Sequence, residues 1–161
     1  MIGGLQKNKV KFLPGRVCLI HSVDNYGLAA EIDKTFGKHN LAADILIEIN
    51  IAGEESKHGI KPSACRDFID KLSEFANINA RGLMTIAPYV QNPEETRDYF
   101  KRMYELFIDI REKCDNVVRD SFNVLSMGMT NDYRIAVEEG STMVRIGTGI
   151  FGSRQNNYQG G

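Results

Sequence analysis

The chain has 161 residues, 42% hydrophobic and 25% charged, so it has enough apolar material for one folded globular domain and does not read as a disordered chain. Its formal net charge is −1 at pH 7, with acids and bases interspersed, which argues against a nucleic acid or an anionic membrane as partner. No apolar run has the length of a membrane span, and the amino-terminal residues lack a secretory signal pattern. These features predict a cytoplasmic protein.

Cysteine usage agrees with that location. Cys18, Cys65 and Cys114 are widely separated, and none has a second cysteine or a histidine at the spacing of a metal site. We therefore expect free, buried thiols in a reducing compartment, and no metal site.

Apolar, β-branched runs of strand length alternate with helical patterns along the chain. The six strand candidates lie within residues 1–5, 16–23, 43–51, 80–88, 122–128 and 143–151. Strands that alternate with helices predict a parallel sheet with right-handed crossovers.

The segments between these strands carry helix start and stop signals. Asp24 or Asn25 can cap the first helix and Gly37 can end it, while Asn92 caps the third and Gly140 ends a short fourth. The predicted buried faces are Leu28, Ala29, Ile32 and Phe36 in the first helix, Cys65, Phe68, Ile69, Leu72 and Phe75 in the second, and Phe100, Met103, Phe107 and Ile110 in the third.

The third strand candidate separates two parallel architectures. Its isoleucines at positions 45, 47, 49 and 51 share one face, whereas Leu46, Glu48 and Asn50 share the other. A doubly wound sheet is covered by helices on both faces and its strands are uniformly apolar, so polar groups on one face favour a barrel. No G-x-G-x-x-G motif follows the first run, which weakens a dinucleotide-binding interpretation. We predict a TIM-type (β/α) barrel.

Two glycine- and hydroxyl-rich loops follow the last two strand candidates, "SMGMTND" and "RIGTG". In (β/α) barrels a phosphate site is often built from the loops after the last two strands. Ser126, Thr130 and Thr148 supply hydroxyl groups, and the glycines let backbone amides approach an anion. Either loop alone reads as an ordinary capped turn, but the pair favours a phosphate ligand.

Arg145 precedes the second loop on the inward face of its strand. A cation on that face needs a partner or contact with water at the mouth of the barrel. A guanidinium there suits a ring nitrogen or an acidic group of a ligand. The alternative is a structural salt bridge to Glu48 across the barrel.

The segments "IGGLQKNK", "HSVD", "EINIAGEESKHGI", "RGLMTIAP", "LSMGMTND" and "GSTMVRIGTGIFGSR" closely resemble the pyridoxal phosphate homeostasis proteins. That family comprises single-domain, fold-type III binders of pyridoxal 5'-phosphate related to the N-terminal barrel of alanine racemase. The resemblance extends to about Arg154. It implies a non-catalytic protein that binds this cofactor and takes part in its intracellular homeostasis, with a partial barrel over residues 1–154 and a flexible tail over 155–161.

The resemblance also implies a cofactor site. In the family the arginine that matches Arg145 faces the pyridine nitrogen, which then stays unprotonated and makes the ring a poor electron sink. Racemases of the same fold type share this arginine but carry a second, β-rich domain with no counterpart in this chain. The implied cofactor-binding residues are Ser126, Gly128, Met129, Thr130, Arg145, Gly147 and Thr148.

One departure from the family concerns the start of the chain. The family's barrel has eight strands, with the Schiff-base lysine at the end of the first, and this chain begins at what matches the third. We therefore expect an N-terminally truncated barrel with about six of eight βα units and no such lysine. Such a chain alone is expected to be either unstable or associated through exposed edges at residues 2–5 and 143–150. Lys57 is the best remaining amine, although a solvated loop lysine is the more ordinary interpretation; Lys7 and Lys9 read as surface charges.

Other residues and functions stay open. His21 ends a strand candidate and is expected to bond into the barrel wall, while Glu48 and Asn50 either meet the cofactor through water or fill a polar layer. One alternative is a barrel enzyme for a phosphorylated metabolite, such as an amino-acid racemase or isomerase, with Glu48 as base and Lys57 as electrophile. Another is an inactive fragment that presents a sheet edge to a partner.

Overall fold

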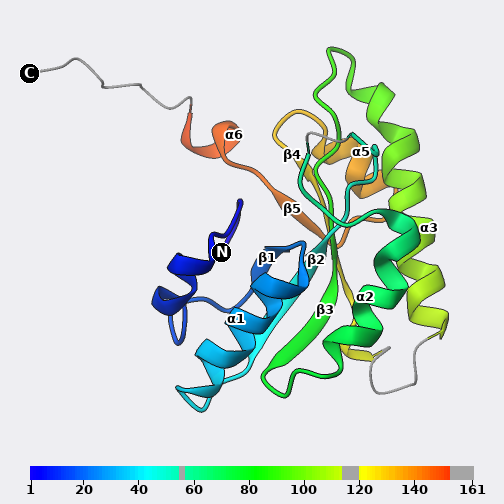
Figure 1. Ribbon diagram of the computed structural model, residues 1–161. Coiled ribbons are helices and arrows are strands. Elements are labelled where there is room, and N and C mark those ends of the chain that lie inside the picture. Colours follow the sequence, from blue (N-terminus) through cyan, green and yellow to red (C-terminus); the bar gives the residue numbers. More distant parts are fainter. Residues whose placement is uncertain (55–56, 114–119, 153–161) are drawn as a thin grey trace, which may run out of the picture.

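The computed structural model describes residues 1–54, 57–113 and 120–152, and in this part of the chain five parallel strands form one sheet (Figure 1). The strands are β1 (Ile20–Val23), β2 (Ala43–Glu48), β3 (Ile78–Met84), β4 (Val124–Met129) and β5 (Met143–Arg145). Their order across the sheet is the order of the chain. A doubly wound sheet reverses direction at a switch point, so the sequential order confirms barrel-type winding.

Helices connect the strands and pack on one face of the sheet, as in the wall of a barrel (Figure 1). The α-helices are α1 (Tyr26–Gly37), α2 (Cys65–Leu72), α3 (Arg97–Lys113), α5 (Tyr133–Glu138) and α6 (Thr148–Phe151). The 3₁₀ helices are η1 (Lys7–Phe12), η2 (Pro62–Ala64) and η3 (Pro93–Thr96). The described sheet is thus an open part of a (β/α) barrel.

Strand β2 shows the two environments that its alternation predicts. Ile45, Ile47 and Ile49 belong to the hydrophobic core under the helices. Leu46 and Glu48 are also buried, but they lie outside that core cluster. The sheet therefore has an apolar outer face and a separate inner face that carries polar groups.

The first and third predicted helices form as expected. The Asn25 side chain accepts the Leu28 N–H at 2.8 Å, and the Asn92 side chain accepts the Glu94 N–H at 3.2 Å. Every residue of their predicted faces is buried. In the second helix only Cys65 and Leu72 are fully buried, and the other three predicted residues pack partly exposed against the core.

One strand candidate is wrong, and another is longer than the strand that it contains. Residues 1–5 form no strand, because Gly3 adopts a φ of 86° and interrupts the extended chain. The segment still lies beside β1, where Met1 O accepts the His21 N–H at 3.0 Å. β5 stops at Arg145 because the apolar run continues into α6. The predicted edge at residues 2–5 is accordingly β1 itself, partly covered, and five strands are found where six were expected.

The structure also tests the predictions for the cysteines and for the end of the short helix α5. Cys65 is buried as predicted, but Cys18 is exposed, so burial of all the thiols is wrong. Cys114 and the predicted tail over 155–161 lie outside the described residues. The short helix α5 ends before Gly140, whose φ of 91° suits a helix stop. None of the helices in the described ranges is long and apolar enough to cross a membrane.

Candidate functional site

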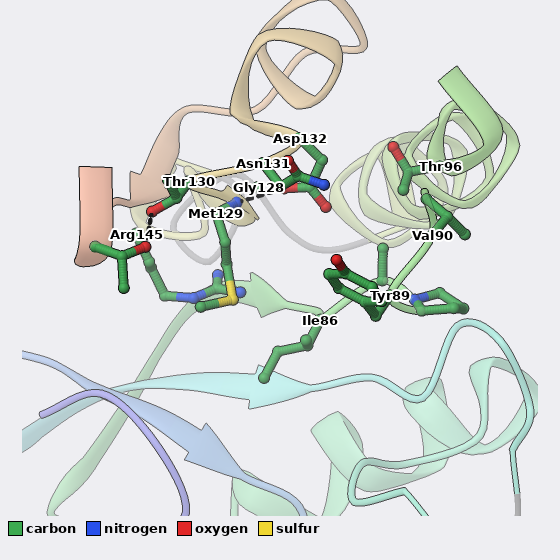
Figure 2. Close-up of a pocket in the computed structure, with 13 residues that line it drawn as sticks. Ile86, Tyr89, Val90, Thr96, Gly128, Met129, Thr130, Asn131, Asp132 and Arg145 are labelled. Carbon is green, nitrogen blue, oxygen red and sulfur yellow. Dashed lines mark hydrogen bonds between the residues drawn. The ribbon is translucent and has the colours of Figure 1, made fainter. Parts of the chain in front are cut away.

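A hollow of about 240 Å³ lies where β3, β4 and β5 end (Figure 2). We call it the first hollow. Its walls are the segment 86–90 after β3, with Thr96 beyond it, the loop 128–132 after β4, and Arg145 and Thr148 around the end of β5. The carboxyl ends of parallel strands meet at one rim, so the winding of the sheet brings these distant segments together.

The two predicted phosphate loops touch at the rim of the first hollow. The Thr148 hydroxyl donates to the Thr130 hydroxyl at 3.0 Å, and the Gly149 N–H donates to the same oxygen at 3.2 Å. The end of β4 packs tightly on α5, because a Cβ on Gly128 would lie 2.5 Å from the Ala136 Cβ. The hydroxyl groups of both loops are thus held side by side, in reach of a single anion.

Arg145 enters the first hollow from β5 and is only 5% exposed. Its Nη1 donates to Ser126 Oγ at 2.8 Å and its Nη2 donates to Thr85 O at 2.9 Å. A guanidinium has five N–H donors, so some remain for a ligand. Burial lowers the pKa of Arg145, and the nearby charges of Glu48 and Asp132 oppose that shift. Its partners are a hydroxyl and a carbonyl, and it does not form the salt bridge to Glu48 that the sequence offered as the alternative.

Ser126 and Gly147 are the two predicted site residues that do not line the first hollow. Ser126 is fully buried in β4, where its hydroxyl accepts from Arg145 and lies 3.3 Å from His21 Nδ1. Its geometry suits positioning the guanidinium more than direct contact with a phosphate. Gly147 caps α6 and sets the backbone on which Thr148 stands.

His21 lies in the wall, as the sequence predicts. It is 5% exposed, and burial together with the charge of Arg145 lowers its pKa to about 4. The imidazole is therefore neutral at pH 7. His21, Ser126 and Arg145 form one buried polar chain behind the first hollow.

A second hollow adjoins the first and shares Ile86 with it. It is lined by Glu48, Ile49, Asn50, Lys57, His58 and Ile86. Asn50 lines this hollow, but its amide is engaged by its own loop: it donates to Glu54 O at 2.7 Å and accepts the Gly53 N–H at 2.9 Å. Lys57 forms an ion pair with Glu54 at 2.8 Å, which agrees with an ordinary loop lysine.

Sequence reasoning missed several residues of this region. Asp132 lines the first hollow, where its carboxylate accepts the Met129 N–H at 2.6 Å and so fixes the turn after β4. Thr85 supplies the carbonyl that holds Arg145. Tyr89 lines the hollow while remaining 89% exposed. An aspartate three residues after Met129 is a recognisable turn signal, but nothing in the sequence singles out the carbonyl of Thr85.

Residues 2–155 match the model of the alanine racemase N-terminal domain family. The chain belongs to this family. A pyridoxal phosphate homeostasis protein of Aquifex aeolicus is 46% identical over 154 residues, which cover 96% of this chain and 66% of the relative. One from Haemophilus influenzae is 36% identical, over 98% of this chain and 64% of its own length. The chain thus spans about two thirds of the length of these relatives and groups with them within the family.

Solved structures agree with the same placement. PipY of Synechococcus elongatus, solved without pyridoxal phosphate, superposes with a TM-score of 0.84 at 31% identity, over 94% of this chain and 69% of PipY. PipY with pyridoxal phosphate bound gives a TM-score of 0.82 at 30% identity, with the same coverage. An alanine racemase of Clostridium difficile superposes with a TM-score of 0.71 at 14% identity over 97% of this chain and 42% of its own, which shows the shared fold alone. The predicted family and fold are confirmed.

Proposed function

We propose that the protein binds pyridoxal 5'-phosphate for intracellular homeostasis of that cofactor and catalyses no reaction of its own. The observation that carries this proposal is the meeting of the Thr130 and Thr148 hydroxyls beside the Arg145 guanidinium at one hollow. The names of the curated relatives and the cofactor bound to PipY support it.

In the proposed complex the phosphate lies against the loops after β4 and β5. Hydroxyl groups of Thr130 and Thr148 donate to it, and the glycines keep the backbone close enough for amide groups to do the same. We propose Gly128, Met129, Thr130, Arg145, Gly147 and Thr148 as the cofactor-binding residues. Ser126 acts through Arg145, whose Nη1 it holds.

Arg145 makes the site better suited to carriage than to catalysis. When bound, the cofactor supplies an aldehyde and an electron-accepting pyridine ring. A guanidinium can donate a hydrogen bond to the ring nitrogen but keeps its own proton, so the ring does not become a pyridinium. This arrangement supports a role in holding the cofactor without promoting reactions at an attached amine.

The described lining of the first hollow contains no lysine. Lys57 lines the second hollow instead, and its ammonium group is paired with Glu54. We therefore propose that this chain holds the cofactor through phosphate and ring contacts. Such binding should be reversible on dilution and should tolerate replacement of the aldehyde.

We also propose that the partial barrel covers residues 1–154, that the protein works in the cytoplasm, and that its sheet edges are where copies of the chain would associate. The free thiols of Cys18 and Cys65 are compatible with a reducing compartment. The outer edges of β1 and β5 each pair with one described strand only, which is the geometry that favours edge-to-edge contact.

Titration of the chain with pyridoxal 5'-phosphate, pyridoxine 5'-phosphate and inorganic phosphate tests the proposed function. Both ring compounds should bind, and more tightly than inorganic phosphate, because only they reach Arg145. The double variant Thr130→Val with Thr148→Val should weaken all three ligands by roughly a hundredfold or more, since each of the two lost hydrogen bonds to a charged group is worth about 1.5–3 kcal/mol. Thr142→Val, at the other end of β5, is the matched control, and equal binding of ring compounds and phosphate would contradict the proposal.

A further inference from the structure

Glu48 is a buried carboxylate without a bonded partner. It is 8% exposed, and within residues 1–54, 57–113 and 120–152 no hydrogen bond or ion pair engages its side chain. Its carboxylate oxygens are not fully enclosed by protein, but burial of the side chain still makes the charged form costly without a partner. The side chain lines the second hollow, so a ligand there can supply what the protein does not.

The charges around Glu48 specify what kind of ligand that is. Burial raises the pKa of Glu48, and the negative charge of Asp24 raises it further. His58 and Arg145 lower the pKa of Glu48, but less strongly. Neither is bonded to Glu48: His58 Nδ1 lies 3.4 Å from the Asp24 carboxylate, and Arg145 donates to Ser126 and Thr85. Two neighbouring acids with no cation bound between them favour a positively charged ligand group.

Neither a metal ion nor the nearest lysine is placed to be the cationic partner of Glu48. Within the described ranges no group of three or more histidine, cysteine, aspartate or glutamate side chains is arranged to hold a metal. Lys57 shares the second hollow, but its ammonium group pairs with Glu54 at 2.8 Å. An ammonium group brought by a ligand is the remaining donor of suitable charge and size.

The two hollows are neighbours, and their chemistry is opposite. Ile86 lines both, and in Figure 2 its side chain lies across the first hollow from Thr130. The first hollow offers hydroxyls and a guanidinium, and its Asp132 carboxylate already accepts the Met129 N–H. The second hollow offers the Glu48 carboxylate, because its Lys57 is paired with Glu54 and its His58 with Asp24. A ligand that spans both would carry an anionic group at one end and a cationic group at the other.

We propose that Glu48 receives a primary ammonium group of a ligand whose phosphate lies in the first hollow. This rests on the proposed function and deepens it, because the ligand class becomes a phosphorylated pyridine that bears an aminomethyl group. The protein then holds the aminated form of the cofactor in preference to the alcohol, which has the same ring and the same phosphate. Glu48 is a specificity residue for the substituent that the phosphate loops do not touch.

Titration of wild type and Glu48→Gln with pyridoxamine 5'-phosphate and pyridoxine 5'-phosphate tests the inference. Wild type should bind the amine about ten- to one-hundredfold more tightly than the alcohol, because a hydrogen bond between charged groups replaces a neutral one. Glu48→Gln should lose that preference and keep its affinity for the alcohol. Glu112→Gln is the matched control, since it makes the same change in an exposed carboxylate of α3 that lines neither hollow and should retain the preference.

The outcomes separate the inference from the proposed function. Equal affinity of wild type for amine and alcohol overturns the inference without any variant, and binding of both still supports the proposed function. Failure of wild type to bind pyridoxine 5'-phosphate overturns the proposed function. Retention of the preference in Glu48→Gln overturns the role of Glu48, and unchanged affinity for the alcohol shows that the variant is folded.

Discussion

The two faces of β2 differ in what their residues do. On the outer face Ile47 is fully buried in the core beneath the helices. On the inner face the Glu48 side chain is 8% exposed, yet it forms no hydrogen bond or ion pair within the described protein. Adjacent positions of one strand therefore serve different ends, one holding the sheet to its helices and the other left available to a ligand. Burial alone does not distinguish a structural residue from a binding residue.

The largest effect is expected on the outer face. Ile47→Ala should lower the free energy of unfolding by about 2–5 kcal/mol, because the site loses apolar contact and leaves a cavity. Chemical denaturation measures this, and titration of the folded variant should show the ligand preferences of the wild type. If the variant changed ligand preference with little loss of stability, the division between the two faces would not hold.

A pH-dependent effect of intermediate size is expected from the inner face. The folded-state pKa of His21 is about 4, below its usual value near 6.5, so the unfolded chain takes up this proton first as pH falls. The stability that this histidine contributes is complete above pH 6.5 and is lost progressively between pH 6.5 and 4, by up to about 3 kcal/mol at 1.36 kcal/mol per pKa unit.

Urea unfolding of wild type and His21→Gln across that range measures the contribution of His21. Glutamine can still bond to Ser126 but does not titrate, so the difference in unfolding free energy between the two proteins should narrow as pH falls. The two proteins must be compared because Glu48 also titrates in both of them. Its pKa is raised on folding, so its contribution to stability grows as pH falls, opposite to that of His21, and it cancels in the comparison. Parallel curves for the two proteins would show that His21 is not the titrating group.

The smallest effect is expected at the loop that borders the second hollow. Asn50→Ala removes three hydrogen bonds within that loop and should lower the free energy of unfolding by about 1–2 kcal/mol. Asn79→Ala is the control, because Asn79 makes one exposed bond to Asp44 and should matter less. Denaturation of both variants gives the comparison, and a larger loss for Asn79→Ala would mean that the loop is not held by Asn50.

The sequence predicts most of the outer face and little of the inner one. The burial of residues such as Phe100 and Met103 can be predicted from their helical spacing, because this spacing places them on one apolar face that packs against the core. A short run carries less information, so "MIGGL" reads as a strand although Gly3 bends it. The end of β5 at Arg145 and the start of α6 at Thr148 could not be predicted, because both elements are short and lie in one apolar run over 143–151.

The candidate site was predictable where it follows from topology. The meeting of the loops that carry Thr130 and Thr148 follows from the rule that parallel strands end at one rim. The partners of individual polar groups do not follow from any rule of spacing. Ser126 turned out to hold Arg145, and Asn50 turned out to hold its own loop, since each took the nearest suitable partner in three dimensions.

The sequential order of the strands has a consequence for synthesis on the ribosome. As each new strand leaves the exit tunnel, the preceding strand of the described sheet has already been made, so each pair can form as soon as its second strand appears. Folding can then proceed by addition, one strand and helix at a time, with the rim that carries both hollows completed last, when β5 arrives. A nascent chain stopped before β5 should have an ordered helical layer and no competent ligand site.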